Sequence, residues 1–158
     1  MYDRNKAVEY AKKWWNKRNP NFYNFDSLGG DCTNFISQCL LAGGYKMDYT
    51  FLGWFYKSLS LRSPSFSGVN ELYRYAINNT LSNGVKAKVC NLQDVEIGDV
   101  IQLRQSKSIF THSLLVTKIL NDSNNLKENI LVSTHTYDCF DRKLSDYYIL
   151  EMRCLKMI

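Results

Sequence analysis

The stretch Leu28-Gly29-Gly30-Asp31-Cys32-Thr33-Asn34-Phe35-Ile36-Ser37-Gln38-Cys39-Leu40 contains a glycine turn, an acidic residue and apolar residues at helical spacing. Asp31 suits the N-cap of a helix that begins at Cys32 and ends at Gly43-Gly44, with its carboxylate accepting a first-turn N–H. The unpaired N–H groups and positive dipole of a helix N-terminus favour a thiolate over a thiol. The stretch therefore predicts a nucleophilic Cys32.

The same stretch also fits a structural role for the cysteine. Positions 32, 35, 36, 39 and 40 share one helix face, and cysteine is often a small core residue. Cys39, two turns further along, fits that role. Cys32 differs because two glycines precede it, and these permit positive φ and the close approach of a substrate. We therefore favour Cys32 as a nucleophile, with Asp31 beside it as a substrate-contacting residue.

Length and composition predict one domain over residues 1–158. The chain is 45% hydrophobic and 14% aromatic, which is enough for a core and excludes a disordered class. Five cysteines without CxxC spacing indicate neither a disulfide framework nor a structural zinc site, and we expect no metal or other cofactor. No signal peptide is evident, so we expect a cytoplasmic protein or an excised domain of an exported one.

The net charge of +5 is dispersed and is densest at Lys12-Lys13 and Lys17-Arg18. Such a cluster is usually a solvated helix face, although it can also help to hold an anionic polymer. No nucleic-acid-binding signature is present, and no apolar run approaches the roughly 20 residues of a membrane span. We expect a monomer that binds no nucleic acid and inserts into no membrane.

The periodicity of the apolar residues predicts an α+β domain with N-terminal helices packed on a C-terminal antiparallel sheet of about five strands. Helices are predicted at 7–18, 32–42 and 69–77, and strands at 85–89, 100–104, 113–120, 130–135 and 148–155. The aromatic residues between positions 49 and 56 fit either a core or the wall of a cleft. In the second case, Trp54 is a candidate substrate-binding residue.

The two histidines both fall in the predicted sheet, with His112 beginning one strand and His135 ending the next. A hairpin centred on residues 121–125 in a symmetric register places them opposite each other on one face. A slip of one residue would turn one ring to the other face. Two histidines that meet near a helix-cap cysteine favour catalysis over packing.

Three segments resemble, in their order, the NlpC/P60 cysteine peptidases of the papain-like group: Asp31-Cys32-Thr33-Asn34-Phe35, Asp94 to Ile101, and Thr111-His112-Ser113. The closer resemblance is to the Putative amidase domain of that group, through Ala7 to Ala11, Asn19-Pro20, Gly29 to Gly44, and His135-Thr136. The resemblance implies a papain-like fold and hydrolysis of amide or peptide bonds in cell-wall peptidoglycan. It also implies Cys32 as nucleophile, His112 as base and His135 as the group that orients His112.

Other assignments stay open at this level. Asp138 is a rival for the orienting role because it lies three residues after His135. A zinc ion held by Cys32, His112 and His135 gives no sequence signal that separates it from a catalytic triad. The alternative to an enzyme is a non-catalytic module that binds glycan or peptide on the same fold.

Overall fold

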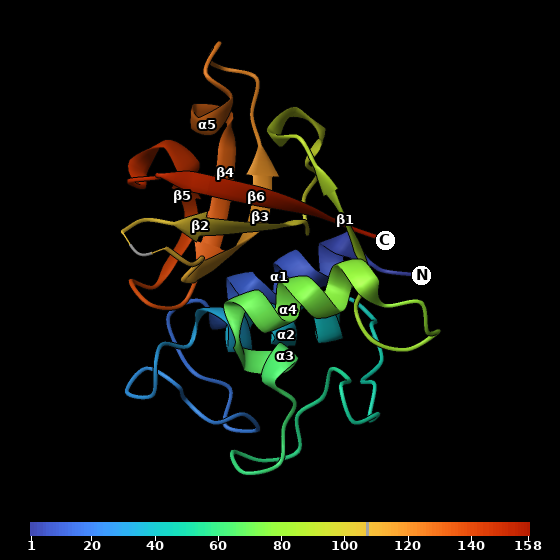
Figure 1. The fold of residues 1–158 in the computed structure, drawn as a ribbon. Coiled ribbons are helices and arrows are strands. Elements are labelled where there is room, and N and C mark those ends of the chain that lie inside the picture. Colours follow the sequence, from blue (N-terminus) through green and yellow to red (C-terminus); the bar gives the residue numbers. More distant parts are fainter. Residues whose placement is uncertain (107) are drawn as a thin grey trace.

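The computed structural model describes residues 1–106 and 108–158, and in this part of the chain the N-terminal helices pack on one side of a twisted sheet (Figure 1). The α-helices are α1 (Arg4–Trp14), α2 (Cys32–Ala42), α3 (Pro64–Ser67), α4 (Val69–Asn78) and α5 (Leu126–Asn129). The strands are β1 (Ala87–Cys90), β2 (Val100–Arg104), β3 (His112–Ile119), β4 (Ile130–Thr134), β5 (Cys139–Lys143) and β6 (Glu151–Met157). None of the described helices is both long and apolar enough to cross a bilayer.

The sheet is antiparallel throughout, in the order β1-β6-β2-β3-β4-β5. Helices α1 and α2 lie against β3, and α4 lies against β1, so the N-terminal helices form one layer (Figure 1). The predicted α+β class and the layer of N-terminal helices are confirmed. The described part of the sheet has six strands where the sequence predicted about five.

The missed strand is β5. Its sequence, Cys-Phe-Asp-Arg-Lys, lacks apolar alternation because β5 is an edge strand with little buried surface. Asp141 within it has a φ of 57°, which fits the irregular pairing between β4 and β5. The first helix ends at Trp14 and not at residue 18, and the last strand begins at Glu151 and not at 148.

Apolar side chains cover both faces of the sheet. The helix-side cluster includes Phe35, Ile36, Trp54, Phe66 and Leu115, and the far cluster includes Ile101, Leu103, Leu114, Val132 and Leu144. Trp54 has no exposed surface, and its indole N–H donates to Ser37 Oγ at 3.1 Å. The prediction of Trp54 as a substrate-binding residue is therefore wrong, because protein atoms surround the ring.

Candidate active site

Cys32 is the first residue of α2, as predicted, and only 5% of its surface is exposed. Its Sγ lies 4.0 Å from the Thr111 carbonyl oxygen and 3.8 Å from Thr33 Oγ1. Burial raises the pKa of the Cys32 thiol, and hydrogen bonds from the Ser113 backbone and from Thr33 oppose this effect only in part. Among these effects burial is the largest, so the Cys32 thiol of this structure ionises less readily than a free cysteine.

His112 begins β3, but its side chain lies on the face of the sheet away from α2. The next residue, Ser113, contacts the helix side, where its hydroxyl lies 2.9 Å from Thr33 Oγ1. Side chains alternate along a strand, so His112 shares the far face with Leu114. The structure describes no contact between His112 and Cys32, although Cys32 lies against the backbone on either side of His112.

The His112 imidazole is 7% exposed, and its ring centroid lies 6.0 Å from that of Tyr147. Its ring nitrogens make no hydrogen bond to any described residue. Burial, and next the charge of Arg142, lower the pKa of His112 to about 4. His112 is therefore neutral at pH 7 and has the lone pair that a general base needs.

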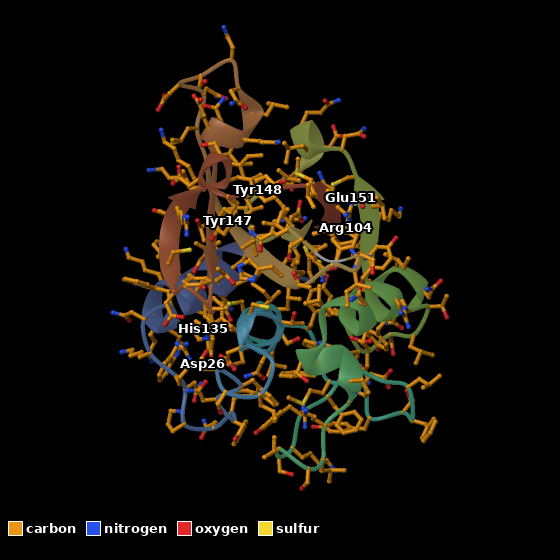
Figure 2. The ribbon with its side chains drawn as sticks, turned by 60° about the vertical axis from the view of Figure 1, so that its left-hand side comes forward. Asp26, Arg104, His135, Tyr147, Tyr148 and Glu151 are labelled. Carbon is orange, nitrogen blue, oxygen red and sulfur yellow. The ribbon has the colours of Figure 1, made fainter. Side chains whose placement is uncertain are left out.

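The pairing of β3 with β4 explains why the two histidines do not meet. Leu115 pairs with Ser133 and Val116 with Val132, so the register continues to place residue 136 opposite His112. The symmetric register of the sequence prediction places His135 there and is wrong by one residue. The slip turns His135 to the helix side of the sheet, where Figure 2 shows it near α2 and apart from Tyr147 and Tyr148.

His135 is enclosed by partners of its own. Its Nδ1 lies 2.5 Å from Asp31 Oδ2 and its Nε2 lies 2.9 Å from the Trp14 carbonyl oxygen. The ring stacks on Phe35 with centroids 3.9 Å apart. Both polar partners are oxygen acceptors, so neither ring nitrogen is available to orient His112.

Asp31 is also enclosed, with 1% of its surface exposed. Its Oδ1 accepts from the Phe25 N–H and from the Asn34 side-chain amide, each at 2.9 Å, while Oδ2 faces His135. The expected cap bond to a first-turn N–H is absent in α2. Asp31 therefore fixes the turn that leads into the helix, and its carboxylate is not open to a substrate.

The rival residue Asp138 pairs with Arg18, at 2.8 and 3.0 Å. Arg18 also binds Asp26 and lies 3.6 Å from Asp31 Oδ2. The carboxylate of Asp138 thus belongs to a charged cluster around Arg18, and no contact joins it to His112. Within the described residues, no three Cys, His, Asp or Glu side chains are grouped to hold a metal ion.

A pocket of about 400 Å³ opens where β3 begins and where β4 turns into β5. Six of its lining residues are Thr111, His112, Thr136, Tyr137, Arg142 and Tyr148. Thr111 connects the pocket to Cys32, because its carbonyl oxygen contacts Sγ. A larger pocket of about 620 Å³ lies between residues 48–53 and α4, and it is lined by no cysteine or histidine among the described residues.

Sequence reasoning missed Tyr137, Arg142 and Tyr148 as lining residues of the smaller pocket. Tyr137 and Arg142 belong to the hairpin of β4 and β5, which the apolar pattern did not show. The run Cys139 to Lys143 alternates neither in hydropathy nor in size, so it carries no sequence signal for a strand.

Comparison with known proteins supports an amidase-type family. A family model described as "Putative amidase domain" matches residues 1–155. The chain is 38% identical over 143 residues to the uncharacterized protein YhbB of Bacillus subtilis (strain 168). That match covers 87% of this chain and 42% of YhbB, so the chain spans less than half of the relative's length. No solved structure matches.

Proposed function

Because the chain belongs to the Putative amidase domain family, we propose that it hydrolyses amide bonds through Cys32, acting on peptide bonds of peptidoglycan. One observation carries the proposal. Cys32 begins α2, and its Sγ contacts the carbonyl oxygen of Thr111, a residue that also lines the pocket containing His112. A nucleophile at a helix N-terminus beside a pocket with a neutral imidazole is suited to acyl transfer.

In the proposed reaction, His112 takes the thiol proton and the thiolate attacks the amide carbonyl carbon. The backbone N–H of Cys32 lies in the first helical turn and stabilises the oxyanion. The C–N bond then breaks, the leaving amine takes the proton from His112, and a thioester joins the acyl group to Cys32. Water hydrolyses this thioester, releasing a carboxylate and restoring the thiol.

This proposal requires the His112 ring to move, because it lies across the strand from Cys32. His112 is the first residue of β3, and Leu103–His112 is the last pair of the β2–β3 ladder. A side chain at a strand end is less constrained than one within the ladder, and catalytic contacts often form only when substrate is bound. His135 acts as a positioning residue through Asp31, which directly precedes the nucleophile.

A non-catalytic peptide- or glycan-binding module is the second candidate. The raised pKa of Cys32 and the lack of a described contact between Cys32 and His112 favour it. In that case the pocket beside His112 holds a ligand and Cys32 is a core residue.

The test is incubation of the protein with purified peptidoglycan, followed by mass spectrometry of the released fragments. We expect fragments whose masses show the addition of one water across a cleaved amide bond. Cys32→Ala and His112→Gln should each lower the rate of fragment release by a factor of about 10³ or more. Cys39→Ala is the matched control, since Cys39 lies buried on the same helix. Fragment release by Cys32→Ala equal to that of wild type would overturn the cysteine mechanism. If the wild-type protein binds peptidoglycan but releases no fragments, the binding module is favoured.

A further inference from the structure

The hairpin turn between β4 and β5 has an unusual backbone. Thr134 pairs with Cys139 across the hairpin, and within the turn Thr136 and Tyr137 have φ values of 63° and 59°. Successive positive φ values occur in type I′ turns, where Asn-Gly is the preferred pair. A β-branched residue followed by an aromatic one is disfavoured in this conformation, because the side chains crowd the backbone.

A second unfavourable feature lies in the same turn. Thr136 Oγ1 is buried and makes no hydrogen bond to any described residue. It lies 3.1 Å from the point that a Cβ on Gly30 would occupy, and Gly30 itself has a φ of +101°. The Thr136 side chain therefore packs on the glycine turn that leads to Cys32. Strained positions and unsatisfied polar atoms are often retained where they support function.

The turn brings Tyr137 to the pocket beside His112. Tyr137 is 86% exposed and Tyr148 is 69% exposed, and both line this pocket. Exposed aromatic rings beside a pocket offer large apolar faces that suit contact with a ligand. The remaining lining includes the planar polar groups of Gln105 and Arg142, and the Arg142 guanidinium is held 4.4 Å from the Tyr147 ring centroid.

We propose that the Thr136–Tyr137 turn contacts the substrate, and that Tyr137 recognises a sugar ring attached to the peptide that is cleaved. A sugar ring presents C–H groups on its faces, which suit an aromatic ring, and hydroxyl groups at its edge, which suit amide and guanidinium groups. The turn keeps its unfavourable backbone because this conformation holds Tyr137 at the pocket. The inference rests on the proposed function and specifies its substrate as a glycan-linked peptide, as opposed to a free peptide.

Binding to the Cys32→Ala protein tests the inference without requiring catalysis. The probes are a disaccharide-linked stem tetrapeptide and the same tetrapeptide without sugar, with Kd measured by calorimetry. We expect the sugar-linked probe to bind about fivefold or more tightly than the free peptide. Adding Tyr137→Asn, which tolerates positive φ, should reduce this preference to less than about twofold without changing the Kd of the free peptide. Adding Tyr49→Asn is the matched control and should preserve the preference, because Tyr49 is exposed at a turn outside this pocket.

Thermal unfolding tests the cost of the turn independently. The double change Thr136→Asn and Tyr137→Gly should raise Tm by at least about 2 °C, because Asn-Gly suits the turn. An unchanged or lower Tm would show that the backbone conformation of the native turn does not reduce the stability of the protein. An unchanged sugar preference in the Tyr137→Asn protein would overturn its role in recognition. If Tyr137→Asn removes the preference for the sugar-linked probe but the protein with Cys32 intact hydrolyses neither probe, the proposal of amide hydrolysis is wrong and the proposal of sugar recognition is supported.

Discussion

The substitution His135→Ala should destabilise the fold by about 3–5 kcal/mol, because His135 is buried with Asp31. The change removes the hydrogen bonds to Asp31 Oδ2 and to the Trp14 carbonyl, each worth about 1–3 kcal/mol when a buried partner is left unsatisfied. Loss of the stack on Phe35 adds about 0.5–1.5 kcal/mol. Arg18 offsets a small part of the lost free energy, since its Nε lies 3.6 Å from Asp31 Oδ2 and can interact with the carboxylate. The total matches the cost of removing one partner from a buried pair.

Urea unfolding followed by tryptophan fluorescence measures this loss at pH 7. The matched control is His112→Gln, which should cost less than about 1 kcal/mol because His112 makes no hydrogen bond to a described residue. The double change Asp31→Asn and His135→Ala should cost less than the sum of the single changes, since each single change already breaks the same bond. A His135→Ala protein as stable as wild type would refute the predicted cost of removing His135 from its buried pair with Asp31.

Three further predictions concern His112 and the thiols. Since the pKa of His112 falls from 6.5 to about 4 on folding, the folded state binds fewer protons than the unfolded state between these values. Stability should therefore decrease by up to about 3 kcal/mol as the pH falls through this window. Urea unfolding at pH 7 and pH 4 should show a larger loss in wild type than in His112→Gln, in which only carboxyl groups with lowered pKa values, such as Asp48, still contribute. The change Arg142→Gln should raise the pKa of His112, because the Arg142 charge disfavours the imidazolium; an NMR titration in which the pKa stays constant would contradict the assignment. Iodoacetamide at pH 7 should label the half-buried Cys90 and Cys139 before the buried Cys32, because the reagent reaches them more easily. Peptide mass spectrometry can determine this order, and fastest labelling of Cys32 would contradict the buried resting state.

The start of α2 was predictable from the sequence because its signals are local. Two glycines with positive φ precede the helix, and Gly43 and Gly44 follow its end. The environment of Cys32 was not predictable in the same way. The effect of the helix N-terminus depends on neighbours in the chain. The burial of Cys32 depends instead on Ser113 in β3 and on Thr111, which precedes β3, and both are about eighty residues away.

The relative placement of the two histidines shows a different limit. Both strands were predicted, but the register depends on details that hydropathy does not encode. The pairing shifts between Val116 and Lys118, and α5 occupies part of the connection that the prediction treated as a simple turn. A shift of one residue is enough to exchange the faces of the sheet. The sequence therefore predicted which strands carry the two histidines. It did not predict which residues they contact, because those contacts depend on the register.

The position of β6 has a consequence for the order of folding. This strand is the last of the described strands along the sequence, yet it lies between β1 and β2 inside the sheet. It also meets the start of the chain, because the Arg4 guanidinium donates to the Met157 carbonyl oxygen at 2.7 Å. During synthesis, β1 therefore cannot pair until β6 has been made, and pairings between strands so far apart in sequence slow folding. A chain that stops at Leu150 would leave β1 without its partner strand and expose an edge of β2, which is a template for aggregation.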